Sequence, residues 1–265
     1  MTPDDTLKLL DLIEVSPGHG VATLRQEDVL IRYAQPGSHA ADLIRRDAEL
    51  LLALSPHGLP GPTLLELDLS GRRLPHAFSC QRLPHPKAVR ARDDEAPAIW
   101  RQLGSHLRRL HALPVLASGV VVPSPDPRGL LEELNETQVI TDSDLRWLDR
   151  WVRHLQAEAG PAQPATLHGS LRPANVLLSP DRRTVLGLLD WSHAQAGDAA
   201  RDYVHLPLST FEALSGTDAR QTAALLLAYV TRLFLDLRDA AQGRAGLAAA
   251  TARLLALFQL NVGGK

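Results

Sequence analysis

Two short apolar runs separated by a turn constrain the fold of this chain more than any other feature. Val176–Leu178 and Val185–Leu189 flank Pro180-Asp181, and this arrangement predicts a β hairpin. A hairpin returns the chain to its starting end, so Asn175 and Asp190, which border the two strands, are expected to lie close together. An amide oxygen and a carboxylate suit a hard cation such as Mg²⁺, which takes few protein ligands. A hairpin with polar ends and no ligand is the alternative.

The first 83 residues predict a mostly antiparallel sheet with one helix. Residues 12–34 alternate as three strands around turns at 17–20 and 26–28. Residues 38–58 predict a helix because apolar side chains recur at helical spacing, and Ser55-Pro56 ends it. Residues 62–83 predict a hairpin across Ser70-Gly71.

The remainder of the chain is expected to be mainly helical. A polar, proline-bearing connection over residues 84–97 leads into it. Helices are predicted at 98–113, 130–134, 142–158 and 218–259, and the segment 165–191 is expected to form the hairpin. The predicted fold is therefore α+β with two lobes, a small β-rich lobe over 1–83 and a larger helical lobe over 84–265 that carries the loop 167–191.

Composition excludes several classes of protein. Of the 265 residues, 45% are apolar, which is enough for a sizeable core, and the net charge of −2 gives no electrostatic case for nucleic acid binding. No apolar run reaches the ~18 residues of a membrane span. The start, residues 1–15, is acidic and is expected to be a short helix capped by Thr2 or Asp4. The single cysteine, Cys80, fits a reducing cytoplasm and is expected to be an ordinary half-buried residue rather than a catalytic thiol.

The segment around the hairpin is similar to a known family. His168-Gly169 precedes Asn175 with fixed spacing, Asp190 stands in "LLDW", and "GDAARD" follows at 197–202. This pattern resembles the aminoglycoside phosphotransferase and choline kinase family, which has a protein-kinase-like fold. "PGHG", "VLIRYA" and "LGSHLRRLHAL" resemble further family segments in the same order, so the likeness extends over nearly the whole chain.

The resemblance implies a nucleotide site with Mg²⁺. Asn175 and Asp190 match the metal ligands of the family. Gly18 and Gly20 match the turn over the ATP phosphates, where a missing side chain lets backbone N–H groups approach the anion. Arg32 stands where the family places a lysine on the third strand.

Further positions follow from the same resemblance. Asp47 stands where a helix glutamate pairs with the strand cation, and the hinge beside the adenine falls on 79–83, with Gln81 and Leu83 as nucleotide contacts. His168 is expected to hold the loop through hydrogen bonds. Arg172 is a candidate for neutralising the transferring phosphoryl group, although a solvated arginine is the plainer interpretation.

Ser170 is the serious departure from the family pattern. The family has an aspartate there, which orients or accepts the proton of the substrate hydroxyl, whereas a serine is neutral and cannot act as a comparable base. A general base contributes about 10²–10⁴ in rate, but phosphoryl transfer depends mainly on positioning and electrostatics. The loss is therefore expected to slow the reaction without abolishing it, unless a carboxylate such as Asp126 or Asp202 lies beside Ser170.

Three functions follow. The first is a slow phosphotransferase that uses ATP or GTP and Mg²⁺ and acts on a hydroxyl of a small molecule. The second is a catalytically silent relative, a pseudokinase, that binds nucleotide or a metabolite and acts through a protein partner. The third is a structural remnant that binds neither. The retained metal pair favours the first two, and Ser170 favours the second over the first.

Overall fold

The computed structural model describes residues 13–14, 20–35, 40–115, 121–215 and 218–262. The chain divides into two compact units. Unit 1 comprises Met1–Val120 and Thr166–Ala196, and unit 2 comprises Val121–Ala165 and Gly197–Lys265. Unit 1 thus contains the whole small sheet together with the whole 167–191 loop, while the lobe boundary between residues 83 and 84 stays a prediction. The expected N-terminal helix lies outside the described residues.

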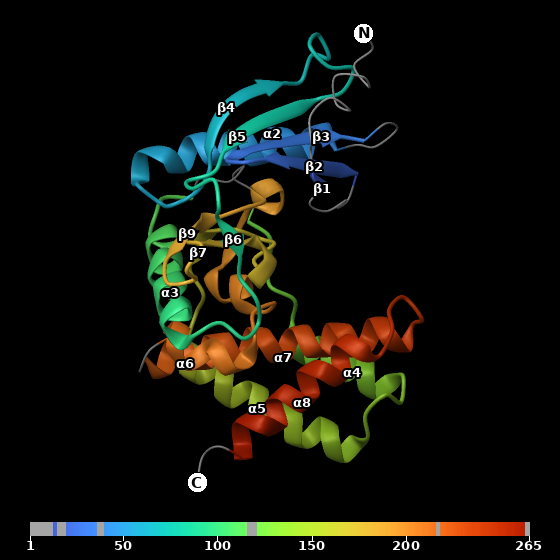
Figure 1. Ribbon diagram of the computed structural model, residues 1–265. Helices are drawn as coiled ribbons and strands as arrows, with labels where there is room; N and C mark the ends of the chain where they lie inside the picture. The colour runs from blue at the N-terminus through green and yellow to red at the C-terminus, as the bar shows by residue number, and fades with distance from the viewer. Residues whose placement is uncertain (1–12, 15–19, 36–39, 116–120, 216–217, 263–265) are drawn as a thin grey trace. The chain divides into compact units, whose positions relative to one another are not determined.

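The first sheet of unit 1 is antiparallel and has the spatial order β1-β2-β3-β5-β4 (Figure 1). Its strands are β1 (Ile13–Glu14), β2 (Val21–Gln26), β3 (Val29–Ala34), β4 (Thr63–Asp68) and β5 (Phe78–Arg82). The three predicted strands and the predicted hairpin are all present in this sheet. Strand β3 is central, and its Arg32 lies opposite Thr23 on β2 and Ser79 on β5.

Helix α2 (Ala41–Leu54) packs on this sheet through contacts with β3, β4 and β5. Its buried face includes Ile44, Leu51 and Leu54, which recur at helical spacing as predicted. Asp47 follows Ile44 by one helical turn and is therefore buried on the same face. A short 3-10 turn, η1 (Ser55–His57), ends the helix at the predicted position.

A second sheet in unit 1 has the order β6-β8-β9. Its strands are β6 (Val89–Arg90), β8 (Val176–Leu178) and β9 (Val185–Leu188), the 3-10 turns η2 (Pro173–Asn175) and η3 (Trp191–His193) flank the hairpin, and helix α3 (Pro97–His111) contacts β9. The β8-β9 pair is the predicted hairpin. Strand β6 was missed because two residues are too few to show strand alternation, and the segment was predicted to be a connection.

A third sheet consists of β7 (Pro164–Leu167) and β10 (Gln195–Asp198), and the division of the chain falls within both strands. The prediction of one hairpin over 165–191 is therefore wrong at its ends. Residues 164–167 belong to a different sheet from β8 and β9, and only the central part of the segment forms the hairpin.

Unit 2 is helical in its described part. Its elements are α4 (Pro127–Glu136), α5 (Asp142–Ala159), η4 (Ala199–Tyr203), η5 (Leu208–Thr210), α6 (Phe211–Ser215), α7 (Ala219–Ala241) and α8 (Ala248–Val262). Helix α7 packs on both α4 and α5 (Figure 1). The core of this contact is formed by Leu131, Leu134, Val152, Val230 and Phe234.

The prediction of continuous helix over 218–259 is wrong at one point. The chain leaves the α7 helix after Ala241, and Gly243 adopts a left-handed φ of 68°. The backbone N–H groups of Arg244 and Ala245 then donate to the Asp239 carbonyl. A glycine in the left-handed region ends a helix without the steric cost that other residues incur there.

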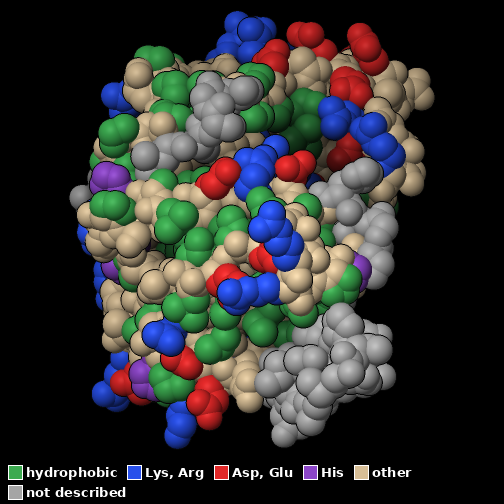
Figure 2. All heavy atoms as spheres, turned by 90° about the horizontal axis from the view of Figure 1, so that it is seen from above, with side chains coloured by type: hydrophobic (Ala, Val, Ile, Leu, Met, Phe, Trp, Pro, Cys, Tyr) green, Lys and Arg blue, Asp and Glu red, His purple; other side chains and the backbone are tan. Residues whose placement is uncertain are grey.

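The described residues place a small antiparallel sheet and a larger helical part in one chain, which confirms the predicted α+β class. In this part of the chain no helix is both long and apolar enough to cross a membrane. On the face seen in Figure 2, arginine and lysine side chains are interspersed with aspartate and glutamate. That distribution agrees with the small net charge.

Gly187 is expected to be required for the packing of the hairpin. Its φ is 154°, and a Cβ atom built there would lie 2.5 Å from the Gly61 Cα atom. We expect Gly187→Ala to lower the free energy of unfolding by about 1–3 kcal/mol, as overpacking does. Gly246→Ala is the matched control, because a Cβ atom there meets nothing within 4 Å. Urea denaturation of both variants measures the effect, and equal stabilities would contradict this account.

Candidate functional site

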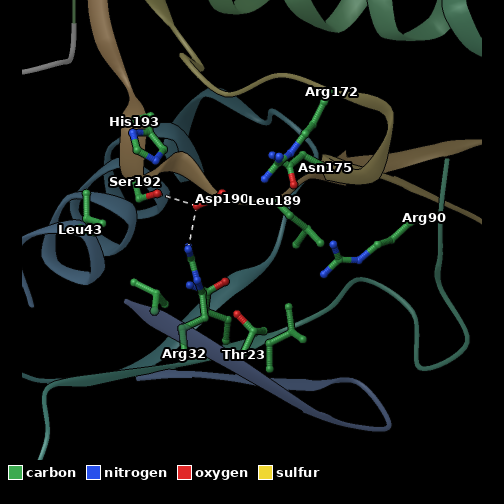
Figure 3. Close-up of a pocket in the computed structure, with 13 residues that line it drawn as sticks. Thr23, Arg32, Leu43, Arg90, Arg172, Asn175, Leu189, Asp190, Ser192 and His193 are labelled. Atoms are coloured by element: carbon green, nitrogen blue, oxygen red, sulfur yellow. Dashed lines mark hydrogen bonds and ion pairs between the residues drawn. The ribbon is translucent and has the colours of Figure 1, made fainter. Parts of the chain in front are cut away.

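A cavity in unit 1 is lined by part of the predicted nucleotide and metal site: Arg32, Gln81, Arg172, Asn175 and Asp190 (Figure 3). It lies among β2, β3, β5, α2, β6 and the ends of the β8-β9 hairpin. The residues that line it are Val21, Thr23, Leu30, Arg32, Leu43, Gln81, Arg90, Arg172, Asn175, Leu189, Asp190, Ser192 and His193. The lining therefore combines apolar side chains with polar ones and with three arginines.

The hairpin brings Asn175 and Asp190 to the same cavity, as the sequence predicted. The Leu189 N–H donates to the Asn175 carbonyl at 2.8 Å, which closes the end of the hairpin. The Asn175 side-chain Nδ2 donates to the Ser170 carbonyl at 2.8 Å, so its Oδ1 atom stays available as an acceptor. Asp190 has a left-handed φ of 66°, a conformation that few non-glycine residues adopt.

Arg32 joins two carboxylates. Its Nη1 atom lies 2.8 Å from Asp47 Oδ2, and its Nη2 atom lies 2.7 Å from Asp190 Oδ1. The predicted pair of strand cation and helix acid is thus present, and the longer arginine spans the gap to a shorter aspartate. The additional contact with Asp190 was not predicted. Arg32 is 7% exposed and Asp47 1% exposed, so both charges are almost fully removed from water.

Asp190 is held in its ionised form. Burial by itself would raise the pKa of Asp190, but the charge of Arg32 and the hydrogen bonds from Ser192 and Arg32 lower it from 3.8 to about 2. Ser192 Oγ and Arg32 both donate to Oδ1. Among the described residues no donor contacts Asp190 Oδ2, so this oxygen is the one available to a ligand.

The Asp47 carboxylate has three partners among the described residues. Besides Arg32, it accepts hydrogen bonds from Gln81 Nε2 and from the backbone N–H of Trp191, the latter at 2.7 Å. The contact with Trp191 ties helix α2 to the segment that follows Asp190. Gln81 lines the cavity as predicted for a nucleotide contact, but its amide nitrogen is used on Asp47 and on Ser79.

His168 holds the loop. It is fully buried, its Nδ1 accepts from the Ser170 backbone N–H at 3.3 Å, and its Nε2 contacts the Leu189 carbonyl at 2.8 Å. These two bonds require the neutral tautomer with the proton on Nε2. Its ring also contacts Trp191, with 4.5 Å between the ring centroids. His168 therefore connects the loop before the hairpin to the strand end beside Asp190.

Gly169 occupies a place where no side chain fits. Its φ is 77°, and a Cβ atom there would lie 2.0 Å from the His193 carbonyl oxygen. The close approach of the two backbones gives the physical reason for a glycine directly after His168.

Ser170 is half-buried and is not among the residues that line the cavity. Within the described part of unit 1, no carboxylate hydrogen-bonds to its hydroxyl group. Asp126 and Asp202 belong to unit 2, where Asp126 caps α4 by accepting from the Arg128 N–H and Asp202 is buried. Arg172, the other charged loop candidate, is exposed and lines the cavity.

The remaining predicted contacts differ in their positions. Gly18 lies outside the described residues, and Gly20 has a left-handed φ of 80° directly before β2. Leu83 does not line the cavity. It packs with Leu30 and Leu177 in an apolar cluster, and its N–H donates to the Asp28 carbonyl at 2.6 Å.

Four polar residues on the cavity wall were missed by sequence reasoning: Thr23, Arg90, Ser192 and His193. Ser192 and His193 directly follow the Asp190 motif, so their proximity to it could have been inferred. Nothing in the pattern around Arg90 indicated the site, because its position depends on the pairing of β6 with β8.

The donor set fits a hard cation. Asn175 Oδ1 and Asp190 Oδ2 are an amide oxygen and a carboxylate oxygen that accept no hydrogen bond from any described residue, and both residues line one cavity. The described residues contain no cluster of three or more His, Cys, Asp or Glu side chains that could hold a metal by themselves. Mg²⁺ usually binds through one or two protein oxygens, with water and phosphate oxygens completing its shell.

Removal of Arg32 is expected to destabilise unit 1 strongly. Arg32→Met leaves Asp47 buried without its cation, and breaking a buried pair from one side costs about 3–5 kcal/mol. Arg45→Met is the matched control, because Arg45 pairs with Glu49 on the exposed face of α2, the helix that carries Asp47. Exposed pairs of this kind contribute little to stability because water screens them. Thermal and urea denaturation compare the two, and similar losses would show that the buried pair has no special role.

The chain was compared with known proteins. The sequence model of the Phosphotransferase enzyme family matches residues 20–256. Acyl-CoA dehydrogenase family member 10 of Mus musculus is 24% identical over 189 residues, which is 66% of this chain but 17% of that protein. The match therefore spans a small part of the curated relative.

Solved structures share the fold. The GDP and kanamycin complex of APH(2")-IIIa has a TM-score of 0.62 at 19% identity, covering 96% of this chain and 94% of that chain. The streptomycin-ATP-APH(2")-IIa ternary complex has a TM-score of 0.59 at 15% identity, covering 96% and 93%. These structures confirm the predicted protein-kinase-like fold, and with a sequence match over nearly nine-tenths of its length the chain belongs to the phosphotransferase enzyme family.

Proposed function

We propose that this protein binds ATP or GTP with Mg²⁺ in the unit 1 cavity and transfers a phosphoryl group slowly to a hydroxyl of a small molecule. The observation that carries the proposal is the position of Asn175 and Asp190 on one cavity with Arg32. In the described part of the chain, neither Asn175 Oδ1 nor Asp190 Oδ2 accepts a hydrogen bond. Relatives of the same fold are known as complexes with GDP or ATP and an aminoglycoside, which supports a nucleotide and a hydroxylated small molecule as the two substrates.

The residues of this chain have separable tasks in that reaction. Asn175 and Asp190 hold the cation, and bound Mg²⁺ supplies charge neutralisation for the phosphate oxygens. Arg32 fixes the orientation of Asp190 and keeps it ionised. The apolar side chains that line the cavity, among them Val21, Leu30 and Leu189, offer hydrophobic surface to a purine ring.

Ser170 limits the rate. Its hydroxyl can accept or donate a hydrogen bond and so can orient an acceptor hydroxyl, but it cannot take up a proton as a carboxylate does. Phosphoryl transfer through a loose transition state requires little base catalysis, so turnover is reduced rather than abolished.

A nucleotide-binding protein without turnover is the second candidate. Two observations favour it: Ser170 has no carboxylate partner in the described part of unit 1, and Arg32 already occupies one oxygen of Asp190. In that case the bound state, rather than a product, is the output, and it acts through a protein partner. Both candidates require the nucleotide site, and they differ only in the chemical step.

Calorimetry of ATP binding tests the site. We expect Mg²⁺ to strengthen ATP binding to the wild type, and Asp190→Asn to remove that enhancement, because an amide does not offer the charged oxygen that Mg²⁺ prefers. Asp181→Asn is the control, since Asp181 lies in the exposed turn of the same hairpin. Absence of nucleotide binding by a folded wild type, with and without metal, would rule out both candidates.

Ser170→Asp tests the chemical step. Restoring a carboxylate at the base position is expected to increase ATP turnover, with water or a polyhydroxylated acceptor, by about 10²-fold or more. Ser179→Asp, a change in the hairpin turn, controls for the added charge. An increase in rate supports the phosphotransferase. If Ser170→Asp binds ATP as the wild type does and still shows no turnover, the protein is the silent nucleotide binder.

A further inference from the structure

The cavity has more positive than negative charge. Arg32, Arg90 and Arg172 line it, and Asp190 is the only carboxylate among the lining residues. Arg32 is matched by Asp47 and Asp190. Arg90 and Arg172 form no ion pair with any carboxylate in the described part of the chain, so two guanidinium groups at this cavity are without a counter-charge.

Arg90 is held in place by its surroundings. It lies on β6, where it pairs with Leu177, and its Nη1 atom donates to the Ala174 carbonyl at 3.3 Å. Arg25 fixes the preceding segment, because it donates to the carbonyl groups of Ala88 and Pro86, both at 2.9 Å. These contacts hold the Arg90 guanidinium group in position at the cavity.

The charges of neighbouring side chains shift the pKa of Arg90. Burial lowers its pKa, Asp190 opposes that effect, and Arg172, Arg25 and Arg32 lower the pKa further. A bound anion would remove this repulsion. Figure 3 shows the side chains of Arg90 and Arg172 directed from two sides toward the space in front of Asn175 and Leu189.

We propose that Arg90 and Arg172 form an anion-binding subsite that takes a phosphate group of a ligand beside Asn175. Guanidinium groups bind phosphate through parallel N–H donors, and two of them from different elements can contact different oxygens of one tetrahedral group. The phosphate belongs either to the polyphosphate of a nucleotide or to a phosphorylated small molecule. The subsite extends the proposed function. It rests on that function only for the identity of the molecule that carries the phosphate group.

The subsite differs from the metal site in its requirements. Asn175 and Asp190 attract a cation, and their contribution to phosphate binding depends on Mg²⁺. Arg90 and Arg172 attract the anion directly, so their contribution persists when divalent metal is absent. Metal-free binding of an inorganic polyphosphate therefore excludes the contribution of the metal site and requires neither a purine ring nor turnover, and the Arg90 and Arg172 variants assign it to the two arginines.

Calorimetry with inorganic tripolyphosphate in the presence of EDTA tests the proposal. We expect the wild type to bind, Arg90→Gln and Arg172→Gln each to raise Kd about tenfold, since hydrogen bonds between charged groups are the strong ones, and Arg90→Lys to fall between them and the wild type. Arg92→Gln is the matched control, because Arg92 is exposed two residues away and does not line the cavity; its Kd should change less than twofold. Melting curves confirm that each variant is folded.

Either of two results overturns the subsite: no tripolyphosphate binding by folded wild type, or an equal loss in Arg92→Gln and Arg90→Gln.

Metal-free competition then identifies the source of the phosphate. Displacement of tripolyphosphate by ATP, with a weaker Kd for ATP in Arg90→Gln, assigns the subsite to the nucleotide. Simultaneous binding of ATP and inorganic phosphate, with only phosphate weakened in Arg90→Gln, assigns it to a phosphorylated small molecule. If tripolyphosphate binds but Mg²⁺ does not strengthen ATP binding, the subsite stands and the proposed function fails.

Discussion

The ion pairs of Arg32 organise the site. One guanidinium on the central strand β3 contacts Asp47 on α2 and Asp190 at the end of the hairpin, so three separate segments of unit 1 meet at one side chain. Burial of these charges is tolerated because each one is paired and hydrogen-bonded. The same contacts fix the rotamer of Asp190 and keep it ionised, while among the described residues no donor contacts its second oxygen.

A second set of contacts supports the loop independently of any ligand. His168 links the Ser170 backbone to the Leu189 carbonyl, and Asn175 links its side chain to the Ser170 carbonyl. These bonds involve the backbone of Ser170 and not its hydroxyl group. A change of side chain at position 170 is therefore expected to leave these loop contacts in place.

Groups that favour a cation and groups that favour an anion both line the cavity. Asp190 and Asn175 offer a carboxylate and an amide oxygen, while Arg90 and Arg172 offer two guanidinium groups. A ligand that carries both a metal ion and phosphate groups would satisfy both sets. The apolar side chains of Val21, Leu30 and Leu189 have no such preference and select only for shape and hydrophobic surface.

The sequence by itself determined the local elements and the pairing that depends on them. Turn residues between apolar runs fixed the hairpin, and hairpin geometry alone brings Asn175 and Asp190 together. Helical spacing likewise predicted the buried apolar positions of α2, whereas Asp47 was predicted only through the family resemblance. The contact between Arg32 and Asp190, the use of Gln81 on Asp47 and the presence of Arg90 at the cavity were decided by tertiary structure. They join segments up to 158 residues apart, and the pairing of strands that are distant in sequence leaves no periodic signal in either strand.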